Sequence, residues 1–305
     1  MGKYLIKDFE ALSGIKAHTI RIWEQRYGIL KPERTSTNIR RYNDDELKLL
    51  LNISTLNRNG YKISKVAQMK RSEIEEKVRD ITATNFDFPN QITALTAAMV
   101  DMNEMEFERV LNVNIVQLGF ESTVENIVFP FLQQIGVMWQ TGSVNAAQEH
   151  FISNLIRQKL IVNIDKMKER YSDFTAKSLL FLPEDEFHEI SLLYFDYQLR
   201  KHHHHTMYLG QNVPLKDITA VNEIFRPQYV FTIFTQRPTE KTIANYVAAL
   251  SKIFPKTPVY VTGFRALYTR KVKWPSNFHL LHNSGEIRLL LKQELDFSLA
   301  PAQKN

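Results

Sequence analysis

The hydrophobic period of the chain changes near residue 176. Between residues 92 and 170, apolar residues such as Phe107, Val110 and Leu111 recur at helical spacing, which predicts a bundle of four helices with short loops. After residue 176, short apolar runs alternate with helical segments, and the runs begin at Ser178, Thr206, Tyr229, Pro258 and Phe278. This alternation predicts a parallel sheet with helices on both faces, of the flavodoxin-like (Rossmann-type) α/β class.

Positive charge is concentrated at the start of the chain. The net charge is +6, from 39 Lys and Arg against 33 Asp and Glu. The first 80 residues contain 17 of the basic and 11 of the acidic residues, so they carry the whole excess. Clustered positive charge on one small unit indicates a polyanionic partner, and nucleic acid is favoured over a membrane surface.

Several classes of function are disfavoured. The chain has no cysteine, which excludes disulfides, thiol nucleophiles and thiolate metal sites. No apolar run approaches a membrane span, and the N-terminus lacks the apolar run of a signal peptide, so we expect a cytoplasmic protein without membrane contact. No Gly-rich phosphate loop and no Ser-His-Asp arrangement can be argued from spacing, so we expect no enzyme activity.

The basic first quarter of the chain predicts a winged helix-turn-helix that binds DNA. A short helix ends at Gly14, and a second helix follows over about Ala17–Arg26, with Ile20 and Trp23 facing inward. The second helix of such a pair enters the major groove. Guanidinium groups in the basic connection that follows can pair with phosphates beside the groove. A helix over Leu47–Met69 is expected to pack under this connection.

The run TIRIWEQRYGILKPER, Thr19–Arg34, with RRY at residues 40–42, resembles the MerR family of winged-helix transcription regulators. The resemblance implies that Trp23 and Tyr27 brace the helix against the wing. Lys16 stands where a Ser helix cap is usual, a change that costs about 1 kcal/mol of capping and adds a phosphate contact. The residues that the resemblance places at the DNA are Lys16, His18, Thr19, Arg21, Arg26, Arg34, Arg40, Arg41 and Tyr42.

In the helical region, Trp139 is followed after nine residues by Glu149 and His150. Imidazole is the commonest side-chain metal ligand, and a neighbouring carboxylate can orient a ligand. A lone His on a bundle helix is nevertheless more often part of a packed core. The spacing alone leaves both interpretations open.

The same spacing resembles the bundle of CarH/LitR-type photoreceptor repressors, which join a MerR-like head to a cobalamin-binding module. The resemblance implies that adenosylcobalamin is bound and that Trp139 and Glu149 pack around its adenosyl group. It implies that His150 becomes the upper cobalt ligand after light breaks the cobalt–carbon bond. In the sheet domain, the segment PEDEFHEIS then offers His188 as the lower cobalt ligand and Glu186 as its partner.

The sheet domain departs from that family where the family holds the nucleotide tail of the cofactor. Ser191 replaces the Gly of the His motif, and Gly263 is followed by Phe264 instead of a second Gly. Thr235 is a tolerable match for a small hydroxyl residue after the third strand. Because small residues let a backbone approach a ligand closely, the departures favour an alternative. In that alternative a degenerate module binds no cobalamin and serves oligomerisation or another ligand.

The expected organisation is multidomain. We expect a winged helix-turn-helix domain over residues 1–80, a four-helix bundle that caps the cofactor over 92–172 and an α/β domain over 176–300, with a polar linker at Ala83–Gln91. The expected function is a transcription regulator that binds double-stranded operator DNA as a dimer or tetramer and responds to adenosylcobalamin and light. The run His202–His205 could suggest a metal site, but neighbouring strand residues face opposite sides, so no more than two of these histidines can converge on one metal. We therefore expect an exposed start of a strand.

Overall fold

Residues 4–141, 143–167, 176–235, 240–269, 272–283 and 285–291 are described by a computed structural model of the chain. The chain divides into two compact units, Met1–Leu155 and Ile156–Asn305. The expected ends of the bundle and of the α/β domain, residues 172 and 300, lie outside the described residues. In the part of the chain that is described, no helix is long and apolar enough to cross a membrane.

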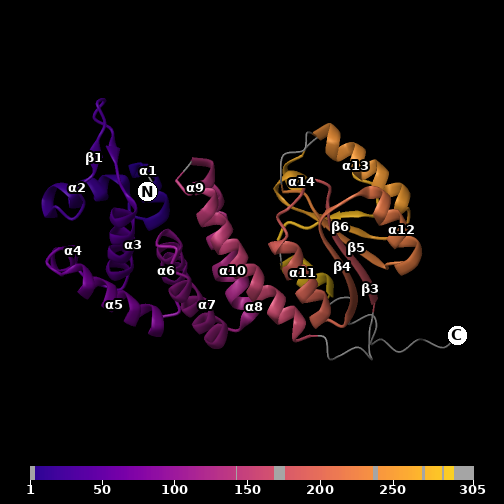
Figure 1. Ribbon diagram of the computed structural model, residues 1–305, viewed down its shortest axis with the longest axis horizontal. Coiled ribbons are helices and arrows are strands. Elements are labelled where there is room, and N and C mark those ends of the chain that lie inside the picture. Colours follow the sequence, from indigo (N-terminus) through magenta and orange to yellow (C-terminus); the bar gives the residue numbers. More distant parts are fainter. Residues whose placement is uncertain are drawn as a thin grey trace. The chain divides into compact units, whose positions relative to one another are not determined.

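The first unit begins with the winged head that the sequence predicts. Its first two helices end at Gly14 and Gly28, and both glycines adopt the left-handed backbone that closes a helix C-terminus. Two short strands pair antiparallel and form the wing (Figure 1). These elements are α1 (Ile6–Ser13), α2 (Ala17–Tyr27), β1 (Glu33–Arg34) and β2 (Arg40–Arg41).

The prediction of one helix over Leu47–Met69 is wrong. α3 (Asp44–Arg58) starts from a capping box, in which Asn43 and Glu46 each accept the backbone N–H of the other. The helix stops before Gly60, whose φ of 87° lies in the left-handed region and breaks the helical path. The helices that follow are α4 (Ile63–Val66) and α5 (Arg71–Thr84).

The prediction of a polar linker at Ala83–Gln91 is also wrong. α6 (Phe88–Val100) begins inside that segment, with Pro89 in its first turn, where a missing N–H breaks no helical hydrogen bond. Arg58 of α3 donates to the Thr93 hydroxyl of α6 at 2.7 Å. The head, residues 4–84, is therefore packed directly on the bundle and belongs to the same compact unit.

The bundle contains four helical stretches, and the third has a π turn. The Phe129 N–H donates to the Val124 carbonyl oxygen, five residues back, immediately before Pro130, which has no N–H to donate. The last helix starts from Asn145, whose side chain accepts the Gln148 N–H at 2.9 Å. This last helix, α10, passes from the first compact unit into the second. After α6 the elements are α7 (Glu104–Leu118), α8 (Phe120–Thr123), η1 (Val124–Val128), α9 (Phe129–Thr141) and α10 (Ala146–Asp165).

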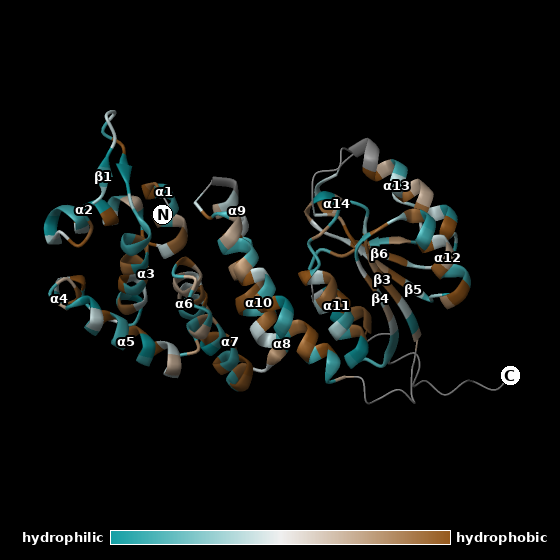
Figure 2. Cartoon of the chain, viewed as in Figure 1, coloured by the Kyte–Doolittle hydropathy of each residue, from teal (hydrophilic) through white to brown (hydrophobic). Residues whose placement is uncertain are grey.

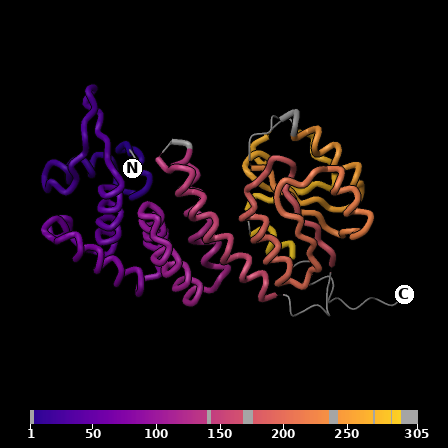
Figure 3. The backbone as a smooth tube through the Cα atoms, viewed as in Figure 1, coloured from indigo at the N-terminus to yellow at the C-terminus, as the bar shows by residue number. Residues whose placement is uncertain are grey.

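The second unit contains the five-stranded parallel sheet that the alternating runs predict. The strand order is β4-β3-β5-β6-β7, the flavodoxin-like order, and each neighbouring pair is parallel. Figure 3 shows the chain winding between the strands and the helices that connect them. The strands are β3 (Ala176–Pro183), β4 (His204–Val213), β5 (Tyr229–Ile233), β6 (Val259–Thr262) and β7 (Phe278–Leu280).

Helices cover both faces of this sheet. Leu179 and Val230 lie in a core with the helices of one face, whereas Leu180 and Phe231 lie in a core with those of the other. Apolar side chains on both faces are typical of a buried parallel sheet, and Figure 2 shows hydrophobic and hydrophilic residues alternating along the covering helices. The first face carries α12 (Leu215–Phe225), α13 (Glu240–Ile253) and α14 (Phe264–Tyr268), and the second carries α11 (Ile190–Lys201) and the helix at 285–291.

His204 contradicts the expectation that His202–His205 is an exposed start of a strand. It is the first residue of β4, it is 4% exposed, and its Nδ1 lies 2.7 Å from the Ser178 hydroxyl oxygen of β3. Burial and, to a smaller degree, the charge of His202 lower the pKa of His204 from 6.5 to about 4. The folded protein therefore keeps this imidazole neutral at neutral pH.

We expect the chain to lose stability as the pH falls from about 6.5 to about 4. In that interval the unfolded chain protonates His204 and the folded chain does not, so the free energy of unfolding decreases by at most about 3 kcal/mol. Thermal unfolding at pH 7 and pH 5 measures the effect, and His204→Gln should show a smaller decrease between the two pH values. An equal decrease in the variant would assign the acid sensitivity to other groups.

Candidate functional site

α2 presents a basic face to solvent. Ile20 and Trp23 are buried in the head, as the predicted inward face requires. On the opposite side, the predicted DNA contacts His18, Arg21 and Arg26 are exposed, and Thr19 is partly buried. An exposed helix face with two guanidinium groups is suited to the edge of a major groove.

The start of α2 is capped by a neighbouring helix. Lys16 makes no side-chain cap hydrogen bond, but Glu10 of α1 accepts the Ala17 N–H at 3.1 Å. The other oxygen of Glu10 lies 3.1 Å from the Lys16 Nζ. The hydrogen bond from Lys16, followed by the one from Ala17, lowers the pKa of Glu10. Glu10 therefore offsets the missing cap, and the Lys16 side chain remains 80% exposed beside α2.

Of the predicted DNA contacts in and beside the wing, some are exposed and others are buried. Arg34 and Arg41 are exposed. Arg40 is mostly buried, and its Nε lies 3.1 Å from both carboxylate oxygens of Glu24. Tyr42 is 1% exposed, and its hydroxyl donates to Glu24 at 3.3 Å. The expectation that Tyr42 contacts DNA is therefore wrong, because its side chain belongs to the core.

Glu24 is a residue that the sequence analysis missed. From α2 it accepts hydrogen bonds from both Arg40 and Tyr42, which lie at the end of the wing. It is the only acidic residue in α2, and this isolated acid on a basic helix is the signal that would have identified it. Its contacts fix the wing against the helix that would enter the groove.

The His150 ring contacts the Glu149 carboxylate near the start of α10. The His150 Nδ1 lies 2.8 Å from one Glu149 oxygen, and the Ser153 hydroxyl donates to the other at 2.6 Å. The His150 side chain is 73% exposed, so it is not the packed core histidine that the spacing had left open. Trp139, near the end of α9, is 50% exposed. All three side chains can reach a ligand in solvent.

The residues after β3 fold around the buried carboxylate of Glu186. One of its oxygens lies 2.8 Å from the His188 Nδ1 and accepts the backbone N–H groups of Phe187 and His188. The other accepts the Thr235 N–H, after β5, at 2.6 Å. The His188 side chain is 51% exposed. A carboxylate on Nδ1 sets the orientation of an imidazole and makes Nε2 the nitrogen that would bind a metal.

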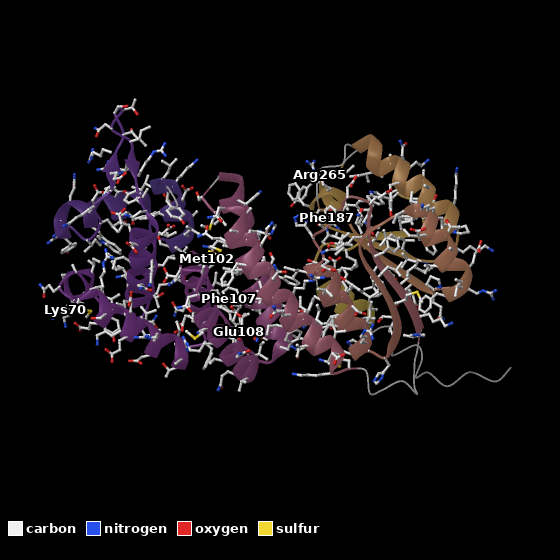
Figure 4. All side chains as sticks on the ribbon, in the orientation of Figure 1. Lys70, Met102, Phe107, Glu108, Phe187 and Arg265 are labelled. Carbon is white, nitrogen blue, oxygen red and sulfur yellow. The ribbon has the colours of Figure 1, made fainter. Side chains whose placement is uncertain are left out.

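This segment, residues 184–189, is called the His188 loop below, and it lies at the switch point of the sheet. From the neighbours β3 and β5 the sheet continues in opposite directions, to β4 on one side and to β6 and β7 on the other. Ligands of such sheets bind beyond the carboxyl ends of the strands at this point. Figure 4 shows Phe187 of the His188 loop and Arg265 of α14 at the same end of the sheet.

Gly263 lies so close to the Phe234 backbone that no side chain fits there. Its φ is 102°, and a Cβ there would lie 2.7 Å from the carbonyl carbon of Phe234. The expectation that Gly263 makes room for a cofactor is therefore not needed to explain the glycine. The neighbouring Phe264 is 61% exposed, with its ring centroid 4.7 Å from that of Tyr268. Ser191, the second residue of α11, is partly buried.

Side chains that could bind a metal ion do not cluster in the described residues. No group of three or more His, Cys, Asp or Glu is placed to hold a metal ion anywhere in that part of the chain. His150 and His188 each have a carboxylate on Nδ1 instead, Glu149 and Glu186 respectively. One oriented imidazole suits a metal whose other ligands come with a cofactor.

Two family models match the chain. Residues 4–73 match the MerR HTH family regulatory protein model, and residues 91–162 match the B12 binding domain model. The first match contains α2 and the wing. The second contains Trp139, Glu149 and His150.

Two curated relatives match over most of the chain, and a third matches over about a quarter of it. The HTH-type transcriptional repressor CarH of Myxococcus xanthus is 27% identical over 273 residues, which cover 86% of this chain and 89% of the relative. The repressor CarA of the same organism is 24% identical and covers 86% of each chain. The HTH-type transcriptional regulator MlrA of Escherichia coli is 36% identical over 73 residues, 24% of this chain and 30% of the relative.

Gly263→Ala should lower the free energy of unfolding by more than about 2 kcal/mol, because a methyl group would meet the Phe234 backbone and the positive φ disfavours alanine. Gly136→Ala is the matched control. Gly136 lies in α9 with nothing within 4 Å of a new Cβ, so alanine should stabilise by about 0.5–1 kcal/mol. Urea unfolding measures both variants. A Gly263→Ala chain as stable as the wild type would contradict the packing role.

Proposed function

We propose that this chain, a CarH-like regulator with a MerR-type head and a B12-binding domain, binds operator DNA through its head and is controlled by adenosylcobalamin. The observation that carries the proposal is the buried Glu186 carboxylate, which orients His188 at the switch point of the sheet. The relatives over most of the chain are transcriptional repressors, and the chain is accordingly a regulator and not an enzyme.

The head supports DNA binding through exposed charge on two elements. Arg21 and Arg26 on α2 and Arg34 and Arg41 on the wing are all exposed. In this proposal α2 enters the major groove, and the wing arginines neutralise phosphates beside it. Arg40 acts indirectly, because its contact with Glu24 holds the wing in place.

The donor residues fit a corrinoid. A corrin ring itself supplies most of the ligands of its cobalt, so the protein would have to add only single imidazoles. His188, with Nδ1 held by Glu186, would be the imidazole of the sheet domain that holds the cobalt. Exposed aromatic side chains at the same end of the sheet, Phe187 and Phe264, offer apolar surface for a large planar ligand.

Bound adenosylcobalamin would supply a cobalt–carbon bond that light can break. Trp139 and Glu149 would contact the adenosyl group, and His150 would hold the cobalt after illumination. Ser191 and Thr235 are assigned as further contacts in the sheet domain. The residue ranges 1–80, 92–172 and 176–300 then bind DNA, cap the cofactor and hold it, in that order.

Operator recognition by a helix-turn-helix head needs more than one copy of the chain. Such heads read two half-sites related by symmetry, which a homo-oligomer provides. We propose a dimer or tetramer that acts on DNA in the cytoplasm. The assembly is the property that the cofactor and light would change, because it determines how many heads reach the operator together.

A second candidate is a regulator whose α/β domain binds no cobalamin. Two observations favour it: Gly263 is taken up by packing on Phe234, and Phe264 stands next to it where the family has a second glycine. Such a module would serve oligomerisation or another ligand. Retention of the cofactor by the purified chain separates the two candidates.

Arg21→Ala is expected to weaken binding to a duplex selected from a random DNA pool by about tenfold or more, because it removes a guanidinium from the exposed face of α2. Fluorescence anisotropy over a range of salt concentrations measures the affinity. Arg79→Ala removes the same charge from an exposed position on α5 and should bind within about twofold of the wild type. Equal losses in both variants would show a general charge effect instead of recognition by α2.

The wild-type chain, mixed with adenosylcobalamin in the dark and desalted, should keep the absorbance of the cofactor. His188→Ala should reduce affinity by at least about tenfold, because the oriented imidazole that would hold the cobalt is gone. His282→Ala, which removes another exposed histidine, should retain the cofactor. His150→Ala should bind in the dark and differ only in the spectrum recorded after green light. A colourless wild-type protein would favour the second candidate.

A further inference from the structure

The His188 loop ends in a second buried carboxylate, that of Glu189. The Glu189 side chain is 6% exposed although it follows the half-exposed His188 directly. One of its oxygens accepts the Tyr208 hydroxyl of β4 at 2.7 Å. Burial, followed by the hydrogen bond to Glu189, raises the pKa of the Tyr208 hydroxyl, so this proton stays in place.

The other oxygen of Glu189 is met by a side chain from α10. The Arg157 Nε lies 2.6 Å from the Glu189 Oε1. Among the described residues this oxygen accepts no aligned hydrogen bond, so the contact is a close charge pair. The Arg157 side chain is 48% exposed. The half-exposed Arg157 on α10 thus neutralises the Glu189 carboxylate, which is buried in the His188 loop.

Further hydrogen bonds hold the His188 loop to β4. The Gln211 amide donates to the Phe187 carbonyl oxygen at 2.9 Å, and the Asn212 N–H donates to the Glu186 carbonyl oxygen at 3.2 Å. These contacts tie the loop to β4. The charge pair between Arg157 and Glu189 differs from these contacts, because Arg157 lies on α10, a helix of the bundle that continues into this unit.

Arg157 lies on the same side of α10 as His150. Arg157 follows His150 by seven residues, which is about two helical turns and brings both residues to one side of the helix. α10 is one uninterrupted helix over this distance. A displacement of the helix at His150 is therefore carried to Arg157, and through the charge pair to the residue next to His188.

We infer that Arg157 is a positioning residue that couples α10, with Glu149 and His150, to the His188 loop. The inference rests on the proposed function for its biological meaning, but the coupling itself is a property of the chain without cofactor. Without Arg157, the Glu189 carboxylate would lie buried with no opposite charge beside it in the part of the chain that is described. The loop would then have to open so that water reaches the carboxylate.

The first experiment measures amide hydrogen exchange of the full chain without cofactor. In Arg157→Met, amides of residues 185–191 should exchange on the order of tenfold faster, because the buried carboxylate loses its counter-charge. Arg157→Lys should recover much of the protection. The double variant Arg157→Met with Glu189→Gln should exchange more slowly than Arg157→Met alone, because no unpaired charge remains buried.

The matched control is Arg200→Met. Arg200 also pairs with a buried carboxylate of this unit, Asp196, with 2.9 Å between Nε and Oδ1, but both residues lie within α11. It should leave exchange in residues 185–191 unchanged. Unchanged exchange in Arg157→Met, or an equal acceleration in Arg200→Met, would overturn the inference.

The second experiment measures the coupling in the loaded protein. The ratio of DNA affinities with and without adenosylcobalamin in the dark should fall towards one in Arg157→Met, while the wild-type ratio lies in the usual range of about 5–150 for coupled sites. An unchanged ratio in Arg157→Met would overturn the inference. A wild-type protein that takes up no cobalamin would count against the proposed function, and the exchange experiment would still decide whether Arg157 positions the loop.

Discussion

The buried carboxylate of Glu186 is the interaction on which the end of the sheet depends. It gathers the backbone of the His188 loop, the His188 ring and the Thr235 N–H onto two oxygen atoms. A buried carboxylate is costly unless it is fully hydrogen-bonded, so the loop cannot relax without losing these contacts together. The carboxylate therefore joins the ends of β3 and β5 and presents an oriented imidazole at the place where such sheets bind ligands.

In the head, too, acidic side chains hold several groups in place. Glu24 holds Arg40 and Tyr42 of the wing against α2, and Glu10 caps α2 while it pairs with Lys16. In a domain with excess positive charge, these acids determine which basic groups are committed to the fold. Arg21, Arg26, Arg34 and Arg41 stay exposed, and they are the groups that a polyanion would meet.

Local sequence signals predicted an element well where residues close in the sequence determine it. The apolar runs predicted the five strands of the described parallel sheet, and Gly14 marked the end of α1. The helix over Leu47–Met69 failed because Gly60 takes a left-handed backbone. The prediction of a linker at Ala83–Gln91 failed because a polar, Pro-bearing segment is equally suited to the first turn of a helix. The hydrogen bond from Arg58 to Thr93 favours the helix.

The sequence by itself determined the order of head, bundle and parallel sheet, because helix and strand periods are local. It named Glu149, His150, Glu186 and His188 only through a resemblance, and their roles stay predictions. Only the tertiary structure decided that Tyr42 and His204 are core residues and that Gly263 packs on Phe234. It alone brought Arg157 to Glu189. Burial and ion pairing between distant residues depend on how the elements pack, and a one-dimensional pattern does not contain that packing.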